Sequence, residues 1–176
     1  MDKLPKNQNQ KDLDLGTGTG AIALAIAKNR SQADVTAVDY SQEALLVAQE
    51  NAQNLQITNI RFLQSDWFSS LQGEKFDVIV SNPPYIAEDD AHLTQGDLSF
   101  EPLSALASGK DGLDDIRKII QAAPSYLNPH GWLILEHGYD QAQKVGELLT
   151  LYCFERISHV PDLSGTLRVT LGRMPQ

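Results

Sequence analysis

The chain has 176 residues, of which 41% are hydrophobic and 21% charged, and its formal net charge at pH 7 is −9. This length suits one globular domain with a sizeable core. No apolar stretch approaches the roughly 20 residues that span a bilayer, no signal-peptide pattern opens the chain, and the 14 Lys and Arg residues form no run. We therefore expect a cytoplasmic monomer without a membrane segment, and we expect no tight binding to nucleic acid through its phosphates.

Residues 1–10 are polar and rich in Asn and Gln, which indicates a tail or linker remnant before one domain at 11–176. From there short apolar runs alternate with segments of helical period, a pattern typical of a doubly wound, mostly parallel α/β sheet. Turn-forming residues at 161–165 predict that an antiparallel hairpin completes a seven-stranded sheet. The expected strands are 12–15, 34–39, 60–65, 76–81, 131–137, 154–160 and 166–173. The expected helices are 21–29, 42–54, 113–126 and 139–153, the last of which ends at the single cysteine, expected to be buried.

A glycine-rich loop, Gly16-Thr17-Gly18-Thr19-Gly20, joins the first expected strand to the first expected helix. Glycines at such a junction let the backbone turn sharply and approach a ligand closely. The G-x-G-x-G spacing differs from the G-x-G-x-x-G of dinucleotide folds. A tight strand-to-helix turn that binds nothing is therefore the alternative.

Acidic residues follow the second and third expected strands. Asp39 is placed to accept both hydroxyls of a ribose, although an interaction with the dipole of the next helix is the alternative. Ser41 could cap that helix without Asp39. After the third strand, Asp66 could accept the exocyclic amine of an adenine while Trp67 packs on the base, and the aromatic residues here could equally belong to the core.

Asn82-Pro83-Pro84-Tyr85 directly follows the fourth expected strand. The prolines end the strand, because neither has an N–H and Pro84 forces Pro83 into an extended conformation. The rigid loop presents an amide, backbone carbonyls and an aromatic ring, a combination that suits a planar group carrying an –NH2. An ordinary strand-ending loop is the alternative. The long irregular segment at 86–110 comes next, and we expect it to face the substrate.

Because ligands of open α/β sheets bind at the carboxyl ends of the strands, we expect the four motifs to converge on one crevice. Together they resemble the class I S-adenosylmethionine-dependent methyltransferases, which have a Rossmann-like fold. The closest resemblance is to the HemK/PrmC family, which methylates the glutamine side-chain amide in the GGQ motif of peptide chain release factors. The segments that carry it are DLGTGTGAIALAIA at 14–27, AVDYSQEAL at 37–45, SDWF at 65–68, SNPPYI at 81–86, FEPLSAL at 100–106, LEHG at 135–138 and RVTLGR at 168–173.

The resemblance implies an enzyme that uses S-adenosyl-L-methionine, releases S-adenosyl-L-homocysteine and needs no metal. The implied cofactor contacts are Gly16, Thr17, Gly18, Thr19 and Gly20 at the methionine end, Asp39 at the ribose, Asp66 and Trp67 at the adenine, and Asn82. The implied catalytic residues are Asn82, Pro83 and Tyr85, which would line the substrate site with Pro84 and Glu101. Glu101 could instead be a solvated loop acid.

Two expectations qualify this interpretation. Family members carry a helical N-terminal domain that helps to dock the release factor, and residues 1–10 hold no such domain, so we expect retained cofactor binding with poor release-factor methylation. The NPPY motif is also shared with methyltransferases that act on an exocyclic amine of adenine or guanine in RNA or DNA, where Tyr85 would stack on an extruded base. The acidic chain offers no obvious basic face for that substrate.

Overall fold

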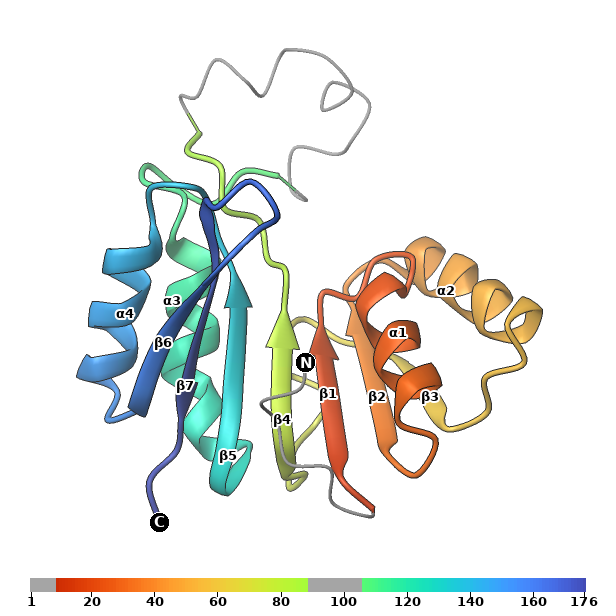
Figure 1. The fold of residues 1–176 in the computed structure, drawn as a ribbon. Coiled ribbons are helices and arrows are strands. Elements are labelled where there is room, and N and C mark those ends of the chain that lie inside the picture. The colour runs from red at the N-terminus through yellow and green to blue at the C-terminus, as the bar shows by residue number, and fades with distance from the viewer. Residues whose placement is uncertain (1–8, 89–105) are drawn as a thin grey trace. The chain divides into compact units, whose positions relative to one another are not determined.

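The computed structural model describes residues 9–88 and 106–176, and the strands within these ranges form one sheet in the order β3-β2-β1-β4-β5-β7-β6 (Figure 1). The seven-stranded α/β fold predicted from the sequence is thereby confirmed. The strands are β1 (Lys11–Leu15), β2 (Asp34–Asp39), β3 (Ile60–Gln64), β4 (Phe76–Ser81), β5 (Leu127–Glu136), β6 (Glu155–Pro161) and β7 (Leu167–Arg173). The helices are α1 (Ala21–Asn29), α2 (Gln42–Asn54), α3 (Asp114–Ala122) with the 3-10 turn η4 (Ala123–Ser125), and α4 (Ala142–Leu151).

The chain forms two compact units, the first of which contains Met1–Ser81 and Tyr126–Gly131. In this unit β1 pairs in parallel with β2 on one side and with β4 on the other. Leu15 lies level with Val38 and with Ser81, and Val38 lies level with Leu63. These four strands therefore end within one residue of the same level, and the loops that follow them begin there.

Local signals explain the helices of the first unit. Gly20 precedes α1 with a φ of 87°, a conformation that suits glycine, and a Cβ there would lie only 3.1 Å from the Cβ of Ala48 in α2. The helix α2 begins after Ser41, whose hydroxyl accepts the N–H of Ala44 at 3.1 Å. This confirms the cap predicted from the sequence.

The second unit contains Asn82–Ser125 and Trp132–Gln176. Here β7 pairs in an antiparallel manner with both β5 and β6, which confirms the predicted C-terminal hairpin. The helix α4 packs against β6 and β7 through its apolar face. The buried side chains of α3 are Ile116, Ile119 and Ile120.

Several predicted boundaries differ from the observed ones. The strand β5 begins at Leu127 rather than 131. The Tyr126 carbonyl just before it accepts the Phe76 N–H of β4 at 2.8 Å, and the Asn128 side chain donates to the Asp77 side chain at 2.8 Å. The helix α4 begins three residues later than predicted, since residues 138–141 form a turn closed by a 3.1 Å backbone bond. Cys153 lies beyond the end of α4 with a φ of 63° and is exposed, so the prediction that it is buried was wrong.

Among the described residues, no helix is long and apolar enough to cross a bilayer.

Two buried carboxyl groups on β1 predict a pH-dependent stability. Asp12 and Asp14 are both 1% exposed, and burial raises the pKa of Asp14 to about 7. Between about pH 4 and pH 7 the folded state therefore holds a proton that the unfolded state has lost, so the free energy of unfolding should fall as the pH rises. Asp14→Asn should reduce the fall between pH 5 and pH 8 by about 2–3 kcal/mol, measured by urea unfolding.

The control is Asp34→Asn, which makes the same chemical change at an exposed position of β2. It should leave the wild-type pH dependence intact. An Asp14→Asn protein whose stability still fell as steeply as that of wild type would contradict the assignment.

Candidate active site

The glycine loop turns through three left-handed backbone conformations, each at a glycine. Gly16, Gly18 and Gly20 have φ values of 68°, 56° and 87°, which side chains other than glycine rarely adopt. Thr17 between them is buried, and its N–H donates to the Val38 carbonyl at 2.9 Å. A Cβ placed on Gly18 would meet no atom within 4 Å, so the loop backbone borders open space at this point.

The Asp39 carboxylate joins this loop to the end of β2. One oxygen accepts the Gly18 N–H and the other accepts the Ser41 N–H, both at 2.8 Å. A carboxylate has about four lone-pair positions, so each oxygen can accept one further donor. Because the Ser41 hydroxyl already caps α2, the bonds of Asp39 organise the loop rather than replace that cap.

Asp14 supports the loop from beneath. Its Oδ2 accepts the Thr17 hydroxyl at 2.7 Å and the Ala23 N–H at 3.1 Å. Its Oδ1 is buried and has no hydrogen-bond partner among the described residues. An acid with a raised pKa and an unpaired oxygen beside an open loop is typical of a functional site.

Trp67 lies against the same loop. Its indole carbons come to 3.4 and 3.7 Å from the position that a Cβ would take on Gly16. The residue has a φ of 46°, and the Ser65 hydroxyl stabilises this turn by donating to the Trp67 carbonyl at 2.7 Å. Asp66 beside it is exposed. Phe68 is buried and stacks on Tyr126 with ring centroids 4.4 Å apart, so it is the core residue of the three.

The Asn82-Pro83-Pro84-Tyr85 segment, called the acceptor loop below, opens the second unit. Asn82 is exposed, Pro83 is buried, and Pro84 and Tyr85 are half-buried. The chain enters this loop from Ser81, whose hydroxyl donates to the Leu15 carbonyl at 2.7 Å.

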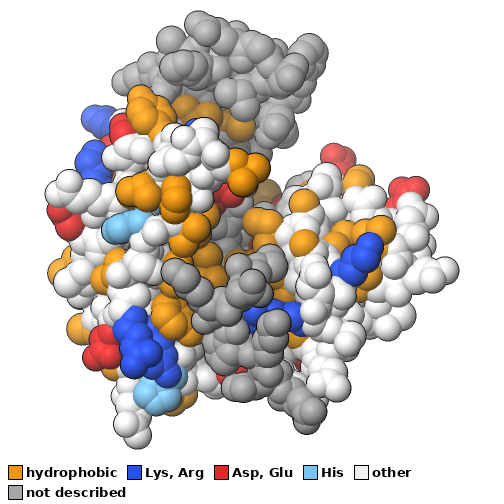
Figure 2. All heavy atoms as spheres, in the orientation of Figure 1, with side chains coloured by type: hydrophobic (Ala, Val, Ile, Leu, Met, Phe, Trp, Pro, Cys, Tyr) orange, Lys and Arg blue, Asp and Glu red, His pale blue; other side chains and the backbone are white. Residues whose placement is uncertain are grey.

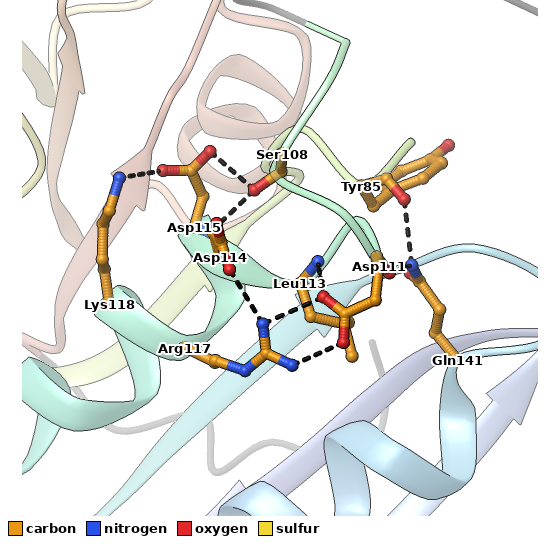
Figure 3. Close-up of polar contacts among 9 residues, drawn as sticks. All are labelled: Tyr85, Ser108, Asp111, Leu113, Asp114, Asp115, Arg117, Lys118 and Gln141. Atoms are coloured by element: carbon orange, nitrogen blue, oxygen red, sulfur yellow. Dashed lines mark hydrogen bonds and ion pairs between the residues drawn. The ribbon is translucent and has the colours of Figure 1, made fainter. Parts of the chain in front are cut away.

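Within the second unit, Tyr85 is bonded at both its backbone and its ring. Its carbonyl accepts the Gln141 side-chain amide at 2.9 Å (Figure 3), and its hydroxyl bonds to the Glu136 carboxylate at the end of β5. Burial raises the pKa of Glu136, while nearby Arg168 and the Tyr85 hydroxyl oppose that rise. The Glu136 side chain therefore gives Tyr85 an acceptor from a strand 51 residues later in the chain.

His137 secures the turn that follows Glu136. The side chain is fully buried, and its two ring nitrogens lie 2.8 Å from the Gly138 carbonyl and 2.8 Å from the Thr170 hydroxyl. Because a carbonyl can only accept, Nδ1 of His137 carries the proton, and Thr170 donates to Nε2. Burial lowers the pKa of His137, which favours this neutral form.

The chain matches one known family over most of its length. The family described as "Methyltransferase domain" matches residues 6–166 of the chain.

The chain belongs to this methyltransferase family.

One curated relative is the release factor glutamine methyltransferase of Pseudomonas aeruginosa, which is 53% identical over 139 residues. The match includes 79% of this chain and 50% of the relative, so the chain spans about half the length of the curated relatives it matches. This identity confirms the resemblance to the HemK/PrmC family that the motifs indicate.

Two solved structures are similar in fold. A methyltransferase from Pyrococcus furiosus has a TM-score of 0.73 at 20% sequence identity, with 98% of this chain and 78% of that chain covered. The Thermus thermophilus 16S rRNA N2 G1207 methyltransferase, solved in complex with AdoMet and guanosine, has a TM-score of 0.68 at 22% identity, with 98% and 40% covered. Both confirm the predicted methyltransferase fold.

The predicted site residues of the methyltransferase fall into two groups. In the first unit, Asp39 and Trp67 both contact the glycine loop, and Asp66 is in the same turn as Trp67. In the second unit lies the acceptor loop, whereas Glu101 is outside the described residues. Their roles toward ligands stay predictions.

Sequence reasoning missed three supporting side chains. Asp14 could have been suspected, because an acid directly before a glycine loop has backbone N–H groups within reach. Ser65 bonds to Trp67 within the SDWF segment, where a short-range turn of this kind is a local signal, whereas Gln141 bonds to Tyr85, which no sequence pattern connects to it.

The bonds of Asp39 predict that its charge stabilises the fold. In Asp39→Asn an –NH2 replaces one oxygen, so one of the two backbone N–H groups faces another donor. We expect a loss of about 1–3 kcal/mol in the free energy of unfolding, measured by urea unfolding. Asp34→Asn, at the exposed other end of β2, should change stability by less than about 0.5 kcal/mol. Equal stabilities of the two variants would show that the bonds contribute little.

Proposed function

We propose that this methyltransferase transfers a methyl group from S-adenosyl-L-methionine to the side-chain amide nitrogen of the glutamine in the GGQ motif of peptide chain release factors. The observation that carries the proposal is the register of β1 and β4, which holds Leu15 level with Ser81. The glycine loop begins directly after Leu15, and the acceptor loop begins directly after Ser81. The name of the Pseudomonas aeruginosa relative supports the choice of glutamine.

The residues of the first unit fit the cofactor. Gly18 borders open space, and backbone this accessible can approach a methionine end closely. Asp39 retains acceptor capacity for a ribose, and the exposed Asp66 carboxylate can accept an adenine amine. The ring of Trp67, which lies beside Gly16, would pack on the adenine. When bound, S-adenosyl-L-methionine supplies a methyl group on a positively charged sulfur, which is already electrophilic.

The acceptor loop supplies what an amide nucleophile lacks. An amide nitrogen is a poor nucleophile because its lone pair is delocalised into the carbonyl. The Asn82 side-chain oxygen and the Pro83 carbonyl would accept its two N–H hydrogens, which directs the lone pair and stabilises the positive charge that develops on nitrogen. Tyr85 would pack beside the amide. The Asn82 and Pro83 acceptors would hold the nitrogen as the N–C bond forms and until it loses a proton to solvent, while the electron pair of the broken S–C bond would stay on sulfur.

A nucleobase amine would suit the same loop, but the charge of the chain argues against it. Binding to a phosphate backbone requires clustered cations, and the net charge is −9. On the face drawn in Figure 2, Lys and Arg side chains form separate small groups rather than one continuous surface.

The proposal predicts that Asn82 acts in methyl transfer rather than in folding. Asn82→Ala should lower turnover on release factor by about 100-fold, because one oriented acceptor is lost. Its affinity for S-adenosyl-L-methionine should stay within about threefold, since the residues proposed to bind the cofactor are mostly elsewhere. Mass spectrometry of the GGQ peptide with labelled cofactor measures the first quantity, and calorimetry measures the second.

Asn54→Ala, at the exposed end of α2, is the matched control and should retain wild-type turnover. If wild type binds the cofactor but leaves the GGQ glutamine unmodified, the substrate assignment is wrong for this chain. If Asn82→Ala has the same turnover on release factor as wild type, the proposed role of the loop is wrong.

A further inference from the structure

Gln141 has a buried side chain, and both the oxygen and the nitrogen of its amide have hydrogen-bond partners. Its Oε1 accepts the Gly138 N–H at 2.8 Å, and its Nε2 donates to the Tyr85 carbonyl at 2.9 Å and to the Asp111 carbonyl at 3.2 Å. Because the Gly138 N–H can only donate, the orientation of the Gln141 amide is unambiguous. Figure 3 shows the side chain of Gln141 reaching from the start of α4 to Tyr85.

This one amide joins three segments that are far apart in sequence. They are the end of the acceptor loop, the turn before α3, and the turn between β5 and α4. Gly112 lies in the second of these with a φ of 71°, and a Cβ there would collide with the Tyr85 carbonyl oxygen. The same turn is anchored to α3 by Arg117, which bonds to Asp111 at 2.5 Å and to Asp114 at 2.9 Å.

The chain that leaves the acceptor loop is also paired. The Ile86 N–H donates to the Leu106 carbonyl and the Ser108 N–H donates to the Ile86 carbonyl, both at 2.9 Å. The Glu88 N–H donates to the Gly109 carbonyl at 3.0 Å. These bonds join two backbone segments beyond the acceptor loop, whereas the Gln141 amide bonds to Tyr85 within it.

We propose that Gln141 is a positioning residue for the acceptor loop: by fixing the Tyr85 carbonyl, it sets the orientation of Asn82 and Pro83 toward the substrate amide. The inference rests on the proposed function of this loop. Its physical basis is the two prolines between Asn82 and Tyr85, whose rings lock φ. Because few dihedrals of this loop can rotate, a movement of the Tyr85 backbone also moves Asn82.

The informative variant is Gln141→Glu, which retains the size and the acceptor for the Gly138 N–H. Its second oxygen faces the carbonyls of Tyr85 and Asp111, where a donor is required. Gln143→Glu, two residues further along α4 and exposed, makes the same chemical change as a control. Gln141→Leu, which adds no charge, serves as the second variant and replaces Gln141→Glu if that protein does not fold.

Hydrogen exchange measured by mass spectrometry tests positioning without reference to any substrate. The amides of Ile86, Glu88 and Ser108 should exchange about fivefold faster or more in Gln141→Glu and Gln141→Leu, because local opening becomes easier. Gln143→Glu should exchange as wild type does. Unchanged exchange in both Gln141 variants would overturn the inference, whatever the substrate of the enzyme.

Turnover on release factor tests the catalytic consequence. At pH 8 kcat should fall by about 100-fold in Gln141→Glu, while the affinity for S-adenosyl-L-methionine is retained. Part of the loss should be recovered relative to wild type as the pH falls toward 6, because the introduced carboxyl group regains one O–H donor when it is protonated. Gln141→Leu should show no such recovery. If the Gln141 variants exchange faster but keep the wild-type kcat, the positioning role is overturned. If the wild-type chain itself is inactive on release factor, the proposed function is refuted, and the exchange result alone decides whether Gln141 positions the loop.

Discussion

The pairing of β1 with a neighbour on each side determines where the functional loops of this methyltransferase begin. Leu15 is level with Val38 in β2 and with Ser81 in β4, so Gly16, Asp39 and Asn82 occupy the next position of their strands or loops. A slip of one residue in either pairing would turn every side chain of a strand to the opposite face. The buried leucines of β1 make such a slip costly, and the positions of the loops follow from that cost.

The same residues serve the fold and the site. Asp39 accepts two backbone N–H groups and retains lone pairs for a ligand. Asp14 is the opposite case, because its second oxygen is buried without a partner among the described residues and its charge is disfavoured there. Such a group lowers the stability of the isolated protein, and natural proteins tolerate it mainly where function requires it.

Features with a local signal could be predicted from the sequence, and features that depend on distant contacts could not. The bounds of α1, α2, β2 and β4 agree with the prediction, because Gly20, Ser41 and Pro83 mark their ends within the chain itself. The start of β5 was missed because its contacts are with a segment far earlier in the chain, where the Phe76 N–H donates to the Tyr126 carbonyl. The Gln141 contact spans 56 positions and follows no periodic pattern. Similarly, the glycine loop, Asp39 and the acceptor loop were found as motifs, while the side chains that hold them were not.

Trp67 gives the protein a spectroscopic reporter at its glycine loop. The chain has two tryptophans, and the indole of Trp67 lies against Gly16 while Trp132 belongs to β5. Indole emission responds to the polarity and mobility of its surroundings, so a change in the glycine loop alters the light that Trp67 emits. With Trp132 replaced by Phe, the remaining fluorescence would follow the state of this loop in real time, without a label or a coupled assay.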